Sequence, residues 1–290
     1  MSVVCVGLAA LDTILAVPRH PAPDDRVVAT DVVVAGGGPA ATAAVALARL
    51  GVPVTFVGSI GDDDAGTAIR RGLEDEGVDV SDLSVVPGAR SPQSAVLVGG
   101  AKRAIATFQG SAPPLELTER VRTRCLEADW VHVDHAGYAA ASGLRAEVRL
   151  SVDAGNPIPE LDLAGLGLYA PTDSALTERY PGLGIDDAAR AAVAEGAALV
   201  VVTTGADGCV AATMGGELVS VPAPAVDPVS TLGAGDVFHG ALLAGLVREL
   251  PLEEALADAN AVAAASCAAL DGRSAIPVRT RFEPGTGGAA

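Results

Sequence analysis

The sequence predicts an α/β fold built on a largely parallel β-sheet. Short apolar runs that suit buried strands alternate with longer stretches of helical periodicity along most of the chain. The chain has 290 residues, half of them apolar, which is enough to bury a large core without help from disulfides or metals. No internal repeat or long linker divides it. We therefore expect one large α/β unit.

The expected elements follow in order. Buried strands are predicted over 2–8, 54–60, 131–134, 149–153 and 198–203, and helices over 40–50, 65–76, 117–127, 186–195, 234–249 and 252–270. Two regions, 16–34 and 92–108, alternate polar and apolar residues instead. They are more like antiparallel strands, and we expect them to pair as a small sheet that projects from the main body. The Gly-rich tail over 278–290 is expected to be flexible.

Charge and composition exclude several classes of function. The net charge is 19 − 36 = −17, which argues against nucleic acid or an anionic membrane as a partner. The single lysine, Lys102, does not lie in a Gly-Lys-Ser/Thr sequence, so there is no P-loop. No apolar run is long enough to span a bilayer, and the N-terminal residues lack secretory-signal features. The four scattered cysteines fit buried thiols, and we expect a cytoplasmic protein.

The most informative motif is Gly233-Ala234-Gly235-Asp236, which opens a long apolar helix. Small residues let a ligand approach the backbone, and the free amides at a helix start favour an anion. Asp236 would then lie beside a bound phosphate, where it could accept the proton of an attacking hydroxyl. The alternative is a tight helix entry in which Asp236 only favours the helix dipole.

A second glycine motif, Gly36-Gly37-Gly38, precedes the first predicted helix. With Ala41 it satisfies G-x-G-x-x-A and raises a dinucleotide-binding alternative. That alternative needs an acidic residue at the end of the next strand, and 54–60 ends without one. The glycines could equally pack against a sugar.

Two further positions have both a structural and a functional interpretation. Asp12 follows the first predicted strand and would lie at its carboxyl end, where open α/β sheets bind ligands. It could hold two sugar hydroxyls or be an ordinary loop residue. The segment from Thr204 to Gly208 could border phosphates or form a hairpin turn.

Taken together and in this order, these motifs, with Gly61-Asp62-Asp63-Asp64-Ala65-Gly66, resemble the ribokinase-like (PfkB-type) sugar kinases from Val3 to about Pro277. The resemblance implies a three-layer α/β/α core over residues 1–277. It also implies a β-sheet lid with strands within about 13–34 and 90–110. ATP with Mg²⁺ would lie over the carboxyl ends of the strands, and a homodimer could form through the lid.

The resemblance also implies roles for individual residues. Asp236 would be the catalytic base, and Gly233, Ala234 and Gly235 the anion hole for the migrating phosphoryl group. The nucleotide would be bordered by Thr204, Gly205 and Gly208, with Asn260 near the adenine. The sugar would be held by Asp12 and by Gly36, Gly37 and Gly38.

Within the family, the sequences of these motifs are most similar to those of the 6-deoxy-6-sulfofructose kinases. This resemblance implies that Arg26 and Gln93 contact the substrate. Four departures qualify this. The arginine that these kinases carry after Asp134 is absent, and Ala41 replaces a sugar-binding Asn. Asp173 stands where an Mg²⁺-organising Asn-x-x-Glu motif is usual. Ser230-Thr231 replaces Asp-Thr, which weakens the expectation of a monovalent-cation site.

The expected function is an ATP-dependent sugar kinase that transfers the γ-phosphate to a hydroxyl, typically primary, of a small sugar. Fructose or sulfofructose is the first candidate, and ribose, 2-keto-3-deoxygluconate or a nucleoside are alternatives. A pseudokinase that senses a sugar or nucleotide is a second class of function. A nicotinamide-dependent oxidoreductase is a third, and the missing acidic residue after 54–60 argues against it.

Overall fold

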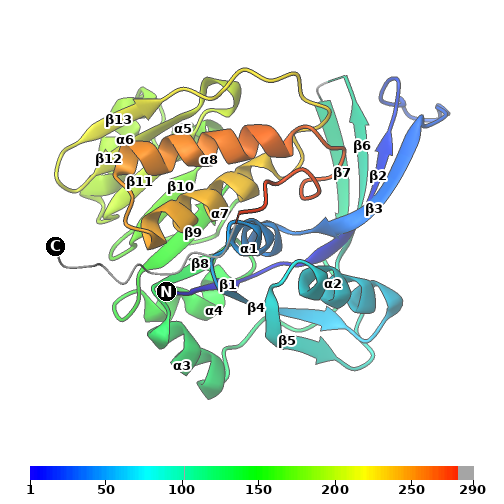
Figure 1. The fold of residues 1–290 in the computed structure, drawn as a ribbon, viewed down its shortest axis with the longest axis horizontal. Coiled ribbons are helices and arrows are strands. Elements are labelled where there is room, and N and C mark those ends of the chain that lie inside the picture. The colour runs from blue at the N-terminus through cyan, green and yellow to red at the C-terminus, as the bar shows by residue number, and fades with distance from the viewer. Residues whose placement is uncertain (101, 280–290) are drawn as a thin grey trace.

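Two β-sheets of unequal size organise the chain in a computed structural model that describes residues 1–100 and 102–279 (Figure 1). The larger sheet has the order β13-β12-β11-β10-β9-β8-β1-β4-β5. From β11 to β5 all pairs are parallel, whereas β12 and β13 run antiparallel. Its strands are β1 (Val3–Val6), β4 (Val54–Gly61), β5 (Asp79–Val86), β8 (Trp130–Val133), β9 (Leu150–Ala154), β10 (Leu168–Pro171), β11 (Leu199–Thr203), β12 (Cys209–Thr213) and β13 (Leu218–Val221).

The large sheet is buried on both faces. In β1, Val3 and Cys5 belong to one hydrophobic cluster, whereas Val4 and Val6 belong to another. The first cluster includes side chains of α1 (Pro39–Arg49), α2 (Asp64–Asp75), α7 (Ala234–Val247) and α8 (Leu252–Ser266). The second includes side chains of α3 (Glu119–Glu127), α4 (Tyr138–Ala141), α5 (Asp173–Arg179) and α6 (Ile185–Ala194). Because alternate residues face opposite helical layers, central strands such as β1 are apolar at every position. The predicted three-layer α/β/α core is confirmed.

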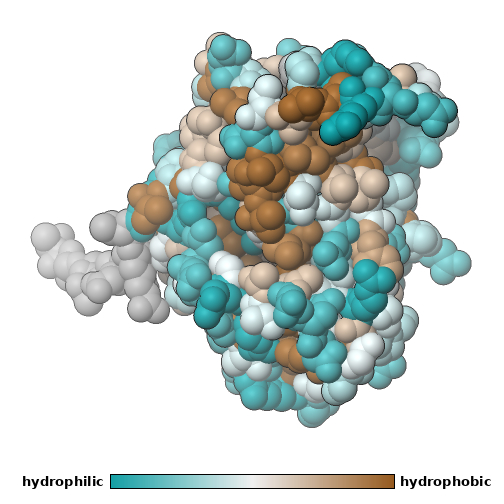
Figure 2. Space-filling model, turned by 90° about the vertical axis from the view of Figure 1, so that its right-hand side faces the viewer, coloured by the Kyte–Doolittle hydropathy of each residue, from teal (hydrophilic) through white to brown (hydrophobic). Residues whose placement is uncertain are grey.

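The smaller sheet projects from one end of the core as a lid (Figure 1). Its order is β3-β2-β6-β7, with strands β2 (Ala10–Ala16), β3 (Asp31–Gly37), β6 (Gln93–Gly99) and β7 (Lys102–Phe108). The inner face packs through Ile14 and Val96, which are fully buried. The outer face is apolar and open, with Val32 and Val34 57% and 61% exposed. Figure 2, which looks at this side of the molecule, shows apolar side chains gathered on it.

Several boundaries differ from the sequence-based expectation. The first two lid strands span Ala10–Ala16 and Asp31–Gly37 and so extend beyond the expected range 13–34 at both ends. The first strand ends at Val6, not at residue 8, and the chain enters the lid at Ala10, so Asp12 lies on a lid strand. The last helix ends at Ser266 instead of continuing to 270. Beyond it the chain turns back, and Gly272 lies against the backbone of Leu232. The sequence pattern reports local helical preference and cannot detect this tertiary contact.

Strands β5, β10, β12 and β13 were not among the expected elements. Each is short or interrupted by charged and small residues, so neighbours in the sheet stabilise it more than its own pattern does. Of the tail over 278–290, expected to be flexible, only Val278 and Arg279 lie within the described residues. None of the helices in the described part of the chain combines the length and apolarity that crossing a bilayer requires.

Candidate active site

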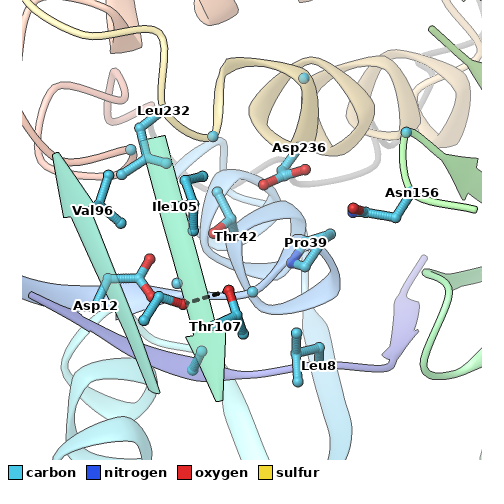
Figure 3. A pocket seen from close by; sticks show the side chains of 18 of the residues that line it. Leu8, Asp12, Pro39, Thr42, Val96, Ile105, Thr107, Asn156, Leu232 and Asp236 are labelled. Atoms are coloured by element: carbon cyan, nitrogen blue, oxygen red, sulfur yellow. Dashed lines mark hydrogen bonds between the residues drawn. The ribbon is translucent and has the colours of Figure 1, made fainter. Parts of the chain in front are cut away.

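A cavity of about 460 Å³ lies between the lid and the carboxyl ends of the parallel strands (Figure 3). Its wall on the core side comes from residues that follow β1, β8, β9, β10 and β11. The lid contributes the inward-facing residues of β2, β6 and β7, and the starts of α1 and α7 complete the wall. Parallel α/β sheets bind ligands at this edge. The cavity is therefore the candidate active site.

Asp236 points into the cavity from the first turn of α7 (Figure 3). Gly233 caps this helix in the left-handed conformation, with φ 72°, which favours glycine. The free amides of the first turn and the carboxylate therefore face the same space. Burial, followed by the charge of Asp153, raises the pKa of Asp236 to about 8. Such a carboxyl group can accept a proton near neutral pH.

Asp12 approaches the cavity from the opposite side, on β2 of the lid. It is 8% exposed, and its Oδ1 has no hydrogen-bond partner among the described residues. Burial raises the pKa of Asp12, while Ser94 and Arg273 act in the opposite direction. A buried carboxylate oxygen without a partner is costly unless a ligand supplies a donor. Asp12 is thus suited to accept hydrogen bonds from hydroxyl groups.

The three glycines of 36–38 line the cavity, and each is required by a close neighbour. A Cβ on Gly36 would overlap the Arg273 guanidinium, and one on Gly37 would overlap the Asp12 carboxylate. Gly38 has φ 92° and lies against the carbonyl oxygen of Leu8. The loop therefore makes room for two charged side chains as well as forming the cavity floor.

The sequence analysis did not single out Arg273, which lies under this loop. Its Nη2 donates to the carbonyl oxygen of Gly37 at 2.8 Å, and its Nε donates to the Oγ1 of Thr42 at 3.1 Å. Burial lowers the pKa of Arg273 to about 10, but the charges of Asp12 and Asp236 counteract this, and the group stays cationic. Nothing in the local sequence 271–277 signals that this arginine is buried.

Asp134 connects the end of β8 to neighbouring segments. Its carboxylate is fully buried and accepts backbone N–H groups from Leu8, Ala40, Ala136 and Gly137 at 2.8–3.1 Å. These bonds fix the start of α1 next to the end of β1. The role of Asp134 is to hold the cavity wall together.

The residues predicted to border the nucleotide lie outside the cavity lining. Gly205 and Gly208 have φ 62° and 103° and form the turn between β11 and β12, so the hairpin interpretation describes this segment. Thr204 lies in the same turn, next to the lining residue Thr203. Asn260 is buried on α8 and donates from Nδ2 to the carbonyl oxygen of Val221 at 3.0 Å. Contacts of these residues with ATP stay predictions.

Three other predicted residues also lie outside the lining. Arg26 is exposed in the connection from β2 to β3. Gln93 is the first residue of β6, and its neighbour Ser94 reaches the cavity instead. Asp173 is exposed at the first position of α5, beside the lining residue Thr172. The cavity therefore brings together Asp12, the two glycine motifs and Asp236, but not these three side chains.

The lid contributes one cation that sequence reasoning also missed. Arg103 on β7 lines the cavity, and its Nη1 donates to the Oγ1 of Thr231 at 2.9 Å. This bond links the lid to the segment just before the Gly233 motif. Alternation along β7, which places Arg103, Ile105 and Thr107 on one face, is the signal that could have found it.

Buried titratable side chains lie behind Asp236. Within the described ranges, His132, Asp153 and His239 are the one set of three side chains of metal-ligand type that come close together. Nδ1 of His239 lies 3.0 Å from Oδ2 of Asp153, and Nδ1 of His132 lies 3.0 Å from Oγ of Ser151. Each imidazole therefore has a polar neighbour, and His239 forms an ion pair with Asp153 when it is protonated.

Residues 1–149 and 181–279 match the model of the pfkB family carbohydrate kinases. The chain belongs to the PfkB family. It is therefore a carbohydrate kinase, of a family that uses ATP. The ATP-dependent ribose-1-phosphate kinase of Halopiger xanaduensis is 32% identical over 94% of this chain and 94% of its own. The ribokinase of Bacillus subtilis is 27% identical over 97% and 98%.

A solved structure agrees with the PfkB fold. Arabidopsis thaliana ribokinase, determined in complex with ribose and ATP, matches with a TM-score of 0.83 over 96% of each chain. At 23% identity this likeness concerns the fold. For this PfkB kinase it supports the division into an α/β/α core and a separate small sheet.

Proposed function

We propose that this kinase transfers the γ-phosphate of ATP to a hydroxyl group, typically primary, of a small sugar held between the lid and the core. The observation that carries the proposal is the position of Asp236 at the amide-bearing start of α7, facing a cavity whose opposite side presents Asp12. Asp236 would accept the hydroxyl proton. The backbone amides of Gly233, Ala234 and Gly235 would stabilise the charge on the transferred phosphoryl group. In the structure the amide of Ala234 donates to the carbonyl oxygen of Thr231 at 3.4 Å, so it would exchange this bond for the phosphoryl group.

The sugar would be bound mainly from the lid side. The unpartnered Oδ1 of Asp12 accepts hydrogen bonds, and Ser94 and Thr107, which are 3.2 Å apart, offer further hydroxyl groups in the same cavity. Closing the lid over the sugar would exclude water and limit hydrolysis of ATP. Fructose and sulfofructose, expected from the motif wording, are two candidates. Ribose and ribose 1-phosphate, named for the relatives, are the others.

ATP would lie toward the side of the cavity formed by the ends of β9, β10 and β11. Asn156, Thr172 and Thr203 line this side and offer neutral polar groups to the phosphates. Mg²⁺ would enter with ATP, since it binds readily through phosphate oxygens and keeps several waters. Asp173, next to Thr172, stays the predicted indirect contact. Whether a monovalent cation is needed is decided by comparing K⁺ with Na⁺ in the assay.

The direct test is an ATP-consumption assay with Mg²⁺ against fructose, sulfofructose, ribose, ribose 1-phosphate, 2-keto-3-deoxygluconate and nucleosides. We expect one sugar to give strong turnover that disappears in Asp236→Asn. Turnover that persists in this variant would overturn the base assignment. No turnover with any sugar, while ATP still binds, would favour the sensing pseudokinase.

The outer face of the lid supports a homodimer. Val32 and Val34 on β3 are mostly exposed, and in register with them on β2 are Leu15 and Thr13. The pattern continues across the sheet through Ala95, Leu97, Ala104 and Ala106. An open apolar sheet face of this kind marks an interaction site. We propose that a second copy covers it.

A further inference from the structure

Three buried side chains behind the proposed base come from three different elements. His132 is on β8, Asp153 at the end of β9 and His239 on α7. Their exposed fractions are 0%, 3% and 3%. His239 follows Asp236 by three residues on the same helix, so the two side chains lie on one face of α7. Asp153 and His239 also line the cavity.

The two histidines differ in what they face. His239 has the carboxylate of Asp153 at 3.0 Å, whereas His132 has only the hydroxyl group of Ser151 at that distance. Burial lowers the pKa of His132 to about 4, so this ring is neutral at neutral pH. Burial also opposes the charge of His239, but Asp153 and Asp236 together outweigh it and raise its pKa. His132 is therefore neutral at neutral pH, whereas the surroundings of His239 favour its cationic form.

The charges around Asp236 show what His239 contributes. Asp153 and Asp134 are the anions that disfavour ionisation of Asp236, and His239 and Arg273 are the cations that favour it. Helix α1 packs beside α7, but its one charged side chain, Arg49, lies at its far end in a bond with Glu76. Without His239, the carboxylates of Asp236, Asp153 and Asp134 would share a poorly solvated space with only Arg273 to offset them. Like charges in such a space favour protonation of one of the carboxylates.

We propose that His239, oriented by Asp153, is a positioning residue whose buried positive charge favours the ionised form of Asp236, the form that can act as a base. The inference rests on the proposed function, because it assigns a partner to the proposed base. During the reaction Asp236 takes the proton of the acceptor hydroxyl. The oxygen of that hydroxyl forms the new bond to the γ-phosphorus, and the bond from this phosphorus to the ADP oxygen breaks. His239 keeps its proton throughout.

The kinetic test compares the pH profiles of kcat and kcat/KM for matched substitutions. In His239→Asn, an amide stays next to Asp153 but the cation is lost. On the acidic side of these profiles activity rises with pH as the base ionises. We expect the midpoint of this rise to move up by about one pH unit or more, and the activity at pH values below it to fall about tenfold. The KM for ATP should be unchanged. His132→Asn makes the same change at a ring that is already neutral, so the midpoint of the pH profile should not move.

A double variant separates charge from packing. In Asp153→Asn/His239→Asn both charges of the ion pair are gone, so the midpoint of the acidic side of the pH profile should return towards its wild-type value. If His239 only supports the packing, the losses of activity in the two single variants should add in the double variant. The loss should then be the same at every pH. A pH profile whose midpoint does not move in His239→Asn would also overturn the proposal.

A measurement without turnover keeps this inference distinct from the kinase assignment. Proton NMR of the imidazole Cε1–H signals, assigned by the single variants, should show His239 still protonated above pH 7 and its pKa lowered in Asp153→Asn. If this is observed while no sugar is phosphorylated, the proposed function fails and the ion pair stands. If Asp236→Asn abolishes turnover but His239 is neutral, the proposed role of His239 fails and the proposed kinase function stands.

Discussion

Arg273 occupies the space that a side chain on Gly36 would need. The guanidinium lies where a Cβ would be placed, and it donates to the carbonyl oxygen of the next residue, Gly37. The glycine loop and the arginine therefore form one unit, in which the missing side chains admit a buried cation. That cation lies close enough to Asp12 and Asp236 to act on the ionisation of both.

Gly36→Ala should disrupt this unit. Because the Cβ would overlap Arg273, the guanidinium or the loop must move, and we expect unfolding to become easier by about 1–3 kcal/mol. Urea denaturation measures this. Gly72→Ala is the matched control: Gly72 lies within α2 with no atom near its would-be Cβ, so this variant should be neutral or up to about 1 kcal/mol more stable. Equal effects in both variants would contradict the close contact.

Asp236→Asn should lower kcat by about 10²–10⁴, because the amide cannot accept the hydroxyl proton. ATP should still bind, since the amides at the start of α7 are untouched. Steady-state kinetics and a nucleotide-binding titration measure the two effects. A variant that loses ATP binding as well would point to a damaged helix start instead of a missing base.

The same substitution should stabilise the fold in a defined pH range. The pKa of Asp236 is raised to about 8 in the folded state, so between its ordinary value of 3.8 and about 8 the folded protein binds more protons than the unfolded chain. The contribution of this group to stability is therefore complete below pH 3.8 and is lost as pH rises through 8. Asp236→Asn should gain in Tm relative to wild type from pH 5 to pH 8 and lose that advantage at pH 4 or below. A constant difference across this range would contradict the raised pKa.

Asp12→Asn tests the sugar side. Its carboxylate has an unpartnered oxygen in the cavity, so replacing it should raise the KM for the sugar by about 10–100-fold. The KM for ATP should change little, because the lid strand β2 lies across the cavity from Asn156 and Thr172. Equal increases in both constants would show that Asp12 supports the fold and does not contact the sugar.

Val34→Lys tests the lid surface. Val34 is 61% exposed on the outer lid face, so a charge there should not disturb the monomer but should oppose burial against a second copy. Light scattering after gel filtration should show a dimer for the wild type and a smaller species for the variant. Met214→Lys, at an exposed apolar residue outside the lid, is the control and should leave the assembly unchanged. A monomeric wild type would exclude the dimer.

The sequence predicted the core and the position of Asp236 better than it predicted the lid side. Strongly apolar composition indicates burial directly, and it marks the strands Val3–Val6 and Val54–Gly61 and the helix Ala234–Val247. The Gly233 motif is local, so spacing was enough to place Asp236. Arg273 depends on a contact with a residue 236 positions earlier, and no local pattern encodes it. Asp12 was expected at the end of a core strand, because the short break after Val6 does not reveal that the chain enters a second sheet.

The late position of Arg273 also affects how the enzyme is made. The glycine loop is synthesised early, but its cation comes from a segment close to the end of the domain, where Arg49 also holds the carbonyl oxygens of Ser274 and Ile276 at 3.0 Å. A chain still growing on the ribosome therefore has a lid and a glycine loop but no finished floor between them. The loop over 36–38 therefore reaches its final form only after the segment that follows α8 has been synthesised.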